Sequence, residues 1–243
     1  MSKKYTAAMI VIGNEILSGR TQDKNINYVA NALVKCGISL IEVRIIPDIE
    51  DVIVDTVATL KQRVDYVFTS GGIGPTHDDI TADCIAKACG VEIKVSQDAH
   101  DMLLAHYGEA DLNEARLRMA RIPVGASLIP NPVSAAPGFI IENVHVMAGV
   151  PRIMQAMTDH VAATLKGGAI LESRTVASSM PESVIAKGLG DIQDCYETVE
   201  IGSYPYFQDG VLGVNVVLRS SDPDALGQAE QAVQNYVDKQ ASQ

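Results

Sequence analysis

Residues 66–81 join a short apolar strand, a glycine-rich loop and the first turn of a helix, and this order restricts the possible folds. Residues 66–68 are apolar, as in a strand that is buried on both faces. Three glycines and a proline follow within residues 71–75, where they can hold backbone conformations that other residues resist. Thr81 begins a helical pattern that Gly90 ends. Open α/β sheets use this arrangement to present backbone N–H groups and a helix N-terminus to a phosphate.

The same loop carries two adjacent carboxylates, Asp78 and Asp79. They would repel an anionic ligand unless a divalent cation lay between, so the loop predicts a combined phosphate and metal site. A simpler interpretation is a tight turn in which one of these carboxylates caps the following helix. A single motif does not decide between the two interpretations.

Expected strands and helices alternate through the first 168 residues. Buried strands are expected at residues 5–12, 39–46 and 66–68. The other expected elements are helices at 23–35, 49–63, 81–89, 97–107, 112–121 and from 151 to about 165, short apolar segments at 127–129, 139–141 and 144–147, and loops at 13–20 and 131–138. This alternation predicts an α/β fold with a mostly parallel sheet and helices on both faces.

Gly167 and Gly168 form the best candidate for a domain boundary. After them the expected order changes to strand, helix, strand, strand and helix, at residues 170–177, 182–189, 199–201, 211–218 and 224–237. The chain is therefore predicted to contain an α/β domain, residues 1–168, and a small α+β domain, residues 169–243.

Composition and charge exclude several classes of protein. Hydrophobic residues make up 47% of the 243 residues, but no apolar run approaches the ~20 residues of a membrane helix. The first residues lack the pattern of a signal peptide, so we expect a cytoplasmic protein without a membrane partner. The net charge is −11, and residues 169–243 hold 4 Lys and Arg against 11 Asp and Glu, so nucleic acid is not an expected partner. The four cysteines are scattered, which indicates free thiols and no zinc site.

Polar side chains follow each of the first three expected strands. They are Glu15, Ser18 and Asp23 after the first strand, Asp48 after the second, and Asp78, Asp79 and Thr81 after the third. Ligands of open parallel sheets bind at the carboxyl ends of the strands, so these side chains are expected at one rim. Asp48 has an alternative role as a helix cap, with Asp51 three residues further along the chain.

Several common motifs are missing from the chain. It has no Gly-x-Gly-x-x-Gly after the first strand, no Gly-Lys-Ser/Thr and no Gly-x-Ser-x-Gly. These absences argue against a nicotinamide site of the usual kind, a Walker A loop and a serine nucleophile on a sharp turn. His77 lies in the glycine loop and could assist a proton transfer, although a histidine exposed to solvent is the simpler interpretation.

The segment from Ser70 to Thr81, Ser-Gly-Gly-Ile-Gly-Pro-Thr-x-Asp-Asp-x-Thr, resembles the signature of molybdopterin-binding domains of the MoaB/Mog type. The chain as a whole resembles the N-terminal part of the CinA family of competence/damage-inducible proteins. The further segments that carry this resemblance are residues 13–19, 119–126, 131–132, 136–139 and 149–152, and residues 200–205 in the KH-like part. Almost the whole chain is matched, in order.

This resemblance implies a three-layer α/β domain that binds a pterin or a nucleotide phosphate at the strand ends, followed by a KH-like α+β domain. In Mog-type proteins the carboxylates that match Asp48 and Asp79 serve metal-dependent adenylyl transfer to molybdopterin. CinA-type domains, and the related domain of eukaryotic FAD synthase, are associated with hydrolysis of nucleotide diphosphates such as ADP-ribose or FAD. The amidohydrolase domain of full-length CinA has no counterpart here, so deamidase activity is not expected.

Two loops depart from the family pattern. Ser134-Ala135 stands where the family commonly has Gly-Thr, and Ala148 and Ile153 stand where it has Pro and Glu. Both loops are expected to border the ligand, so the identity of the substrate stays open. The KH-like domain is acidic and lacks a Gly-x-x-Gly loop, so we expect no RNA binding there.

The leading hypothesis is a nucleotide pyrophosphatase that depends on Mg²⁺ or another divalent cation. Asp48 and Asp79 are the expected catalytic residues, and Asp48, Asp78 and Asp79 the expected metal ligands. The expected substrate- and phosphate-binding residues are Gly13, Glu15, Ser18, Ser70, Gly71, Gly72, Gly74, Pro75, Thr76, Thr81, Asn131, Pro137 and Gly138. The alternatives are molybdopterin binding or adenylylation, and a non-enzymatic ligand-binding or interaction module. A homo-oligomer, most simply a dimer, is expected because symmetric assemblies are common.

Overall fold

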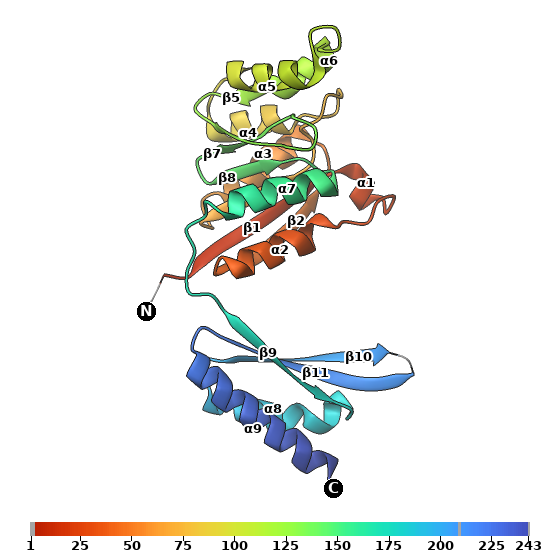
Figure 1. The fold of residues 1–243 in the computed structure, drawn as a ribbon, viewed down its shortest axis with the longest axis vertical. Helices are drawn as coiled ribbons and strands as arrows, with labels where there is room; N and C mark the ends of the chain where they lie inside the picture. Colours follow the sequence, from red (N-terminus) through yellow and green to blue (C-terminus); the bar gives the residue numbers. More distant parts are fainter. Residues whose placement is uncertain (1–2, 209, 243) are drawn as a thin grey trace. The chain divides into compact units, whose positions relative to one another are not determined.

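The computed structural model describes residues 3–208 and 210–242, which form two compact units, Met1–Gly168 and Ala169–Gln243. The first unit contains a six-stranded sheet with the strand order β2-β1-β3-β8-β7-β6 (Figure 1). Its strands are β1 (Tyr5–Ile12), β2 (Ile38–Ile46), β3 (Tyr66–Ser70), β6 (Ser127–Ile129), β7 (Gly138–Ile141) and β8 (Val144–Met147). Strands β2, β1, β3 and β8 are parallel, and β7 and β6 are antiparallel, which confirms the predicted mostly parallel sheet.

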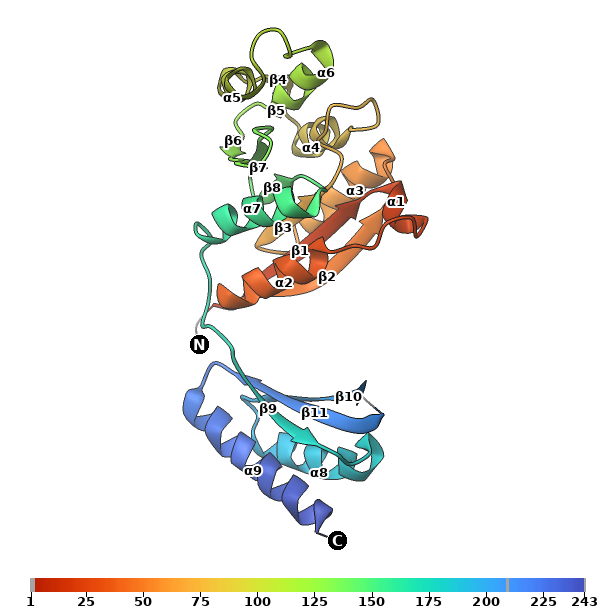
Figure 2. The same ribbon diagram turned by 45° about the vertical axis from the view of Figure 1, so that its right-hand side comes forward.

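Helices cover both faces of this sheet (Figure 2). They are α1 (Asn14–Leu17), α2 (Asn25–Lys35), α3 (Glu50–Leu60), α4 (Thr81–Cys89), α5 (Gln97–Tyr107), α6 (Glu114–Leu117) and α7 (Pro151–Ala162). Successive residues of β1 point to opposite faces because a strand has a period of two. Ile10 therefore packs in one buried cluster with Ile53 of α3, and Met9 packs in a second cluster with Leu33 of α2 and Met157 of α7. The predicted three-layer arrangement is confirmed.

Residues 112–121 do not form the single helix that their periodicity predicts. The four-residue helix α6 is followed by a 3₁₀ turn, Arg118–Ala120, and then by strand β5 (Arg121–Pro123), which pairs with β4 (Ile93–Val95). The pairing of β5 with β4 requires an extended backbone from Arg121 onward, and this long-range contact is not visible in the local periodicity of residues 112–121. The expected loop at residues 13–20 likewise contains the short helix α1.

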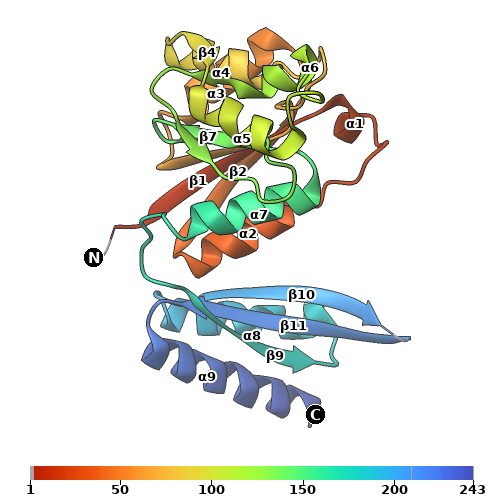
Figure 3. The same cartoon turned by 45° about the horizontal axis from the view of Figure 1, so that its top comes forward.

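The second unit contains five elements in the predicted order: β9 (Glu172–Ser178), α8 (Glu182–Cys195), β10 (Glu200–Gln208), β11 (Val211–Ser220) and α9 (Pro223–Ala241). Strand β11 lies in the middle and is antiparallel to both neighbours, and α8 and α9 pack against the sheet (Figure 3). Strand β10 is much longer than predicted and continues through Pro205. Proline is tolerated there because β10 is an edge strand of this sheet. The predicted small α+β module is confirmed.

Across residues 3–208 and 210–242, every helix is too short or too polar to span a lipid bilayer.

Candidate functional site

The carboxyl ends of the four parallel strands meet at one rim of the sheet, and a cavity of about 610 Å³ opens there. Its walls come from the loops after β1, β2, β3 and β8 and from the segments around residues 107–119 and 131–136. A cavity of this size falls within the range that holds small-molecule ligands and cofactors. The rim is therefore the candidate binding site of the first unit.

The glycine loop is held against the start of α4 by contacts that require glycine. Gly71 has φ 110°, and a Cβ atom on it would lie 2.1 Å from the carbonyl oxygen of Ile12. Gly72 has φ 69°, and its Cβ would lie 2.1 Å from Oγ1 of Thr81. Thr81 Oγ1 donates to the Gly71 carbonyl at 3.0 Å, and the Thr81 N–H donates to the Gly72 carbonyl at 3.0 Å. The loop and the helix therefore form one rigid piece.

The next three backbone N–H groups of the loop are free. Those of Gly72, Ile73 and Gly74 donate to no acceptor in the described part of the chain, and all three residues line the cavity. Successive unpaired N–H groups in a loop form a concave site for an anion. This is the feature on which the predicted phosphate site depends.

Asp78 and Asp79 are bound inside the loop and do not cap α4. Asp79 Oδ2 accepts from the N–H of Thr76 at 2.8 Å and lies 2.5 Å from its hydroxyl oxygen, while Asp78 Oδ1 lies 2.6 Å from the same hydroxyl oxygen. The hydrogen bond from the Thr76 side chain lowers the pKa of Asp78, so this carboxylate is charged at neutral pH. The N-terminal cap of α4 is Ile80, without a side-chain bond, so the helix-cap interpretation of the two carboxylates is wrong.

Asp48 joins the loop after β2 to the loop after β1. Its Oδ2 accepts from the N–H of Asn14, the first residue of α1, at 2.9 Å. The cap of α3 is Ile49, which makes no side-chain bond, so Asp48 does not cap that helix as its alternative interpretation required. The carboxylate instead satisfies a free N–H at the start of α1.

The structure brings many of the predicted site residues together on the cavity wall. They are Glu15, Asp48, Gly71, Gly72, Gly74, Pro75, Thr76, Asp78, Asp79 and Asn131. Asn131 also shapes its own loop, because its side chain accepts from the N–H groups of Val133 and Ser134 and donates to the carbonyl oxygen of Ala136.

The other predicted residues lie behind or beside the cavity. Ser70 and Thr81 are buried under the glycine loop, where Ser70 Oγ accepts from Asn25 Nδ2 at 2.8 Å. Gly13 donates its N–H to the Ile46 carbonyl, and Ser18 ends the exposed helix α1. Gly138 is buried in β7, where a Cβ would lie 2.3 Å from the Val146 carbonyl oxygen. These residues support the loops and do not line the cavity.

The loop after β8, which was expected to border the ligand, lines the cavity with Ala148, Gly149, Val150 and Pro151, because β8 is parallel to β3. A further group of cavity residues escaped the sequence prediction. Tyr107, Arg116 and Met119 also line the cavity, and they come from two segments, residues 97–107 and 112–121, that were each predicted to be a plain helix. No local signal distinguishes these side chains from those of an ordinary surface helix.

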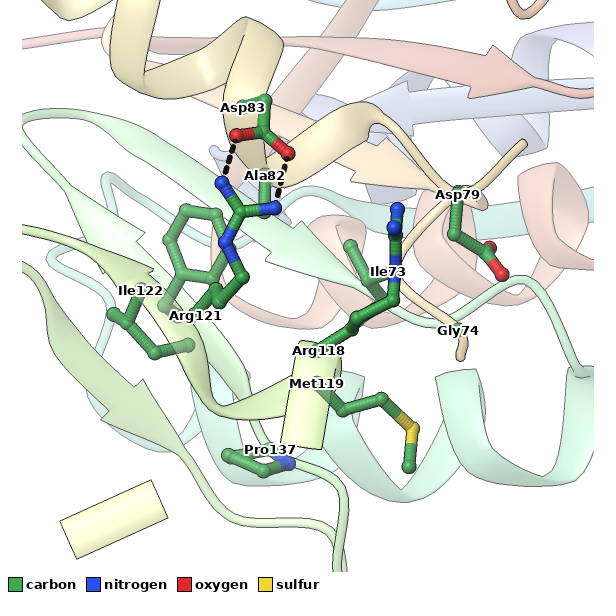
Figure 4. Close-up of a pocket in the computed structure, with 12 residues that line it drawn as sticks. Ile73, Gly74, Asp79, Ala82, Asp83, Arg118, Met119, Arg121, Ile122 and Pro137 are labelled. Carbon is green, nitrogen blue, oxygen red and sulfur yellow. Dashed lines mark hydrogen bonds and ion pairs between the residues drawn. The ribbon is translucent and has the colours of Figure 1, made fainter. Parts of the chain in front are cut away.

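A small hollow of about 20 Å³ lies beside the cavity and shares the wall residues Gly72, Gly74 and Asp79 with it. In Figure 4, Arg118 lies between Asp79 and the pair formed by Arg121 and Asp83, whose two bonds measure 3.1 and 2.5 Å. Arg118 makes no ion pair with a described residue, and its Nε is buried without a partner. The hollow is large enough for a water molecule that would satisfy this Nε.

The carboxylates at the cavity fit a cation that is shared with a ligand. Within the described residues, no three His, Cys, Asp or Glu side chains are already grouped to hold a metal ion. Mg²⁺, however, is commonly held by one or two carboxylates together with water and substrate phosphates. One or two of the cavity carboxylates Asp48, Asp78 and Asp79 would supply the protein oxygens to such an ion, and the phosphates would approach from the glycine loop.

A model of the family described as "Probable molybdopterin binding domain" matches residues 8–167 of the chain. The chain belongs to this family. A second model, described as "FAD synthase, middle domain", matches residues 171–243. The first match confirms the MoaB/Mog-type domain that the signature from Ser70 to Thr81 predicts.

Several known proteins are similar in sequence to most of this chain. A protein of Caldivirga maquilingensis is 32% identical over 97% of this chain and 97% of its own length. A CinA-like protein of Citrifermentans bemidjiense is 36% identical over 63% of this chain and 38% of its own length. The crystal structure of the protein CinA from Thermoplasma acidophilum has a TM-score of 0.63 and 36% identity, covering 66% of this chain and 98% of that one. The predicted resemblance to CinA is confirmed.

Proposed function

We propose that the chain is a nucleotide pyrophosphatase that depends on a divalent cation and cleaves a compound such as ADP-ribose or FAD. The observation that supports this proposal is the meeting of free N–H groups at Gly72–Gly74 with the carboxylates of Asp48 and Asp79 at one cavity. The N–H groups suit the anionic oxygens of a diphosphate, and the carboxylates suit a hard cation bound to the same oxygens.

In this proposal the protein acts mainly by positioning. The N–H groups of the glycine loop would bind the diphosphate, and carboxylates among Asp48, Asp78 and Asp79 would hold the cation and its water molecules from loops that are fixed by Thr76 and Asn14. A bound divalent cation would offset the negative charge that develops on the phosphate oxygens. Water attacks one phosphorus atom and the bond from that phosphorus to the bridging oxygen breaks. The bridging oxygen leaves on the other phosphate, the protons of the water pass to solvent or to the leaving phosphate, and two phosphate monoesters are released. No covalent nucleophile is required.

The test is to incubate the protein with ADP-ribose or FAD, with Mg²⁺ or with a chelator, and to measure AMP release by chromatography. We expect Mg²⁺-dependent cleavage that falls about 100-fold or more in Asp79→Asn, because the amide loses the charge that holds the cation. The amide oxygen can still accept from the Thr76 N–H, so the loop should keep its shape.

Asp55→Asn is the matched control, since it removes the same charge from an exposed position on α3 that does not line the cavity. The control should retain wild-type activity. Unchanged cleavage by Asp79→Asn, or cleavage that persists in the chelator, would contradict the assigned role of the carboxylates.

Molybdopterin binding is a second candidate, and the family match over residues 8–167 favours it. It would use the same cavity, with the pterin phosphate on the glycine loop. Tight binding of molybdopterin without release of AMP from either nucleotide would support this function over diphosphate hydrolysis.

A further inference from the structure

The residues that line the cavity form two chemically different groups. The first group consists of the free N–H groups and the carboxylates of Glu15, Asp48, Asp78 and Asp79. The second consists of Tyr107, Arg116 and Met119, and Arg116 is the only Lys, Arg or His among the described residues that line the cavity. An anion with its cation suits the first group, so the second group is available for a different part of the ligand.

Arg116 is fixed in place by contacts with its own segment. Its guanidinium lies 4.2 Å from the centre of the Tyr107 ring, and its Nη1 donates to the backbone carbonyl of Asp111. The backbone N–H of Arg116 donates to Asn113 Oδ1 at 3.0 Å, which caps α6. These contacts hold the plane of the guanidinium before any ligand binds, so stacking on it costs little further side-chain entropy.

The Arg116 guanidinium is only partly covered. Its central carbon lies 4.2 Å from the centre of the Tyr107 ring, 34% of the side chain is exposed and the residue lines the cavity, which leaves part of the guanidinium open to a second planar group. A planar guanidinium stacks well on flat aromatic systems because it is weakly hydrated and delocalised. The neighbouring side chain of Met119 adds a polarisable apolar surface of the kind that packs against ring edges.

Arg116 is less suited to a phosphate. Its Nη1 is already used by the Asp111 carbonyl and lies 3.9 Å from the Asp111 carboxylate, which partly offsets the positive charge. The free N–H groups of the glycine loop carry no competing carboxylate of this kind and are the better candidates for binding an anion. A cavity of about 610 Å³ also has room for more than a diphosphate.

We infer that the planar heteroaromatic ring of the ligand, such as a purine, flavin or pterin, stacks on the open part of the Arg116 guanidinium to form a layer of Tyr107, Arg116 and ring. This inference rests on the proposed function only in placing the phosphates at the glycine loop. Arg116 then selects for ligands that carry a ring, and the glycine loop selects for phosphate. Stacking of a base on a side chain contributes about 1–3 kcal/mol.

The test compares ligands with and without a ring by isothermal titration calorimetry in the presence of Mg²⁺, each with a methylene bridge in place of the bridging oxygen so that the proposed hydrolysis cannot consume it during the titration. ADP-ribose and FAD carry a diphosphate and a ring, and inorganic pyrophosphate carries only the diphosphate. Arg116→Lys keeps the charge but loses the plane, so we expect the Kd for ADP-ribose and FAD to rise about 10-fold while the Kd for pyrophosphate changes less than about twofold. Arg219→Lys, at an exposed position in the second unit, is the matched control and should leave all three unchanged.

Tyr107 provides an independent check within the same layer. Tyr107→Leu, which loses the ring under Arg116, should weaken the binding of the ring-bearing ligands more than Tyr107→Phe, which keeps that ring. An equal loss for pyrophosphate and ADP-ribose in Arg116→Lys would overturn the inference, because it would identify Arg116 as a phosphate ligand. Unchanged binding of all three ligands would overturn it as well. If Arg116→Lys weakens only the ring-bearing ligands and the wild type releases no AMP, the ring site is supported and the proposed hydrolysis is contradicted. A failure of the ring site can therefore be told from a failure of the proposed function.

Discussion

At the scale of single residues, each aspartate at the cavity already has a local partner. Asp48 binds the Asn14 N–H, Asp79 binds the Thr76 N–H, and Asp78 lies 2.6 Å from the Thr76 hydroxyl oxygen. These bonds use only part of each carboxylate, which has about four acceptor positions, so oxygens remain for a cation and its water. An Ala substitution would disturb both the loop and the proposed chemistry. An Asn substitution removes the charge and keeps an acceptor, so it separates the two effects.

His145 gives the stability of the first unit a dependence on pH. It is 5% exposed in β8, with its ring 5.0 Å from that of Phe68, and burial lowers its pKa below the ordinary value. A histidine in the unfolded chain takes up a proton at about pH 6.5, whereas His145 in the folded chain takes up its proton only at a lower pH. The contribution of neutral, buried His145 to stability is therefore present above about pH 6.5 and is lost as the pH falls.

We expect the free energy of unfolding, measured in urea, to fall between about pH 7.5 and pH 5.5 more steeply in the wild type than in His145→Gln. The substitution itself will lower stability at both values, so the informative quantity is the difference between the two slopes. Equal slopes in the two proteins would show that His145 takes up its proton in the folded state as readily as in the unfolded chain.

At the scale of elements, the glycine loop and α4 depend on a close approach of backbone to side chain. Gly72 and Gly90 both have positive φ, 69° and 67°, but they differ in surroundings. A Cβ on Gly72 would overlap Thr81 Oγ1, whereas a Cβ on Gly90 would meet no atom within 4 Å. Alanine substitutions at Gly72 and Gly90 therefore separate the cost of backbone strain, which both share, from the cost of steric overlap, which only Gly72 has.

Gly90→Ala should lower the free energy of unfolding by about 1 kcal/mol, the cost of a left-handed conformation for an L-residue. Gly72→Ala should lower it by about 1–3 kcal/mol more, because Thr81 has to move from under the loop. Urea unfolding followed by circular dichroism measures both values. Equal losses in the two variants would mean that the loop yields without strain and is not rigid.

At the scale of the whole molecule, each unit has its own buried core, and the two units are joined by residues without regular structure. The glycines at the boundary belong to the first unit. A Cβ on Gly167 would lie 1.6 Å from the Cys36 carbonyl oxygen, and the Gly168 N–H donates to the Gly37 carbonyl at 3.2 Å. The close approach of the Cys36 carbonyl group to Gly167 therefore explains why this position is glycine, in addition to the flexibility that glycine gives to a connection between units.

Limited digestion with thermolysin should cut first at the connection, near Ile170, whose side chain is 60% exposed and lies outside any helix or strand. We expect two resistant fragments, near residues 1–169 and 170–243, identified by mass spectrometry. First cuts inside β10 or β11, or digestion of one unit without a stable fragment, would contradict the description of two units with separate cores.

The sequence alone determined the alternation of strands and helices, the glycine loop and the small second module. These features depend on local periodicity and on residues such as Gly71 and Thr81, whose conformational preferences act over a few positions. The breakdown of the helix expected at residues 112–121 shows the limit, because pairing with Ile93–Val95 competed with a local pattern.

Only the tertiary structure decided which side chains face the ligand cavity. Asp48 binds Asn14 across 34 positions, and Arg116, which packs on Tyr107, lines a cavity that Ala148 and Ile153 line as well. The direction of β8 relative to β3 places its carboxyl end at the same rim. Such relations depend on how distant elements pack, and packing energy is not encoded in any short segment.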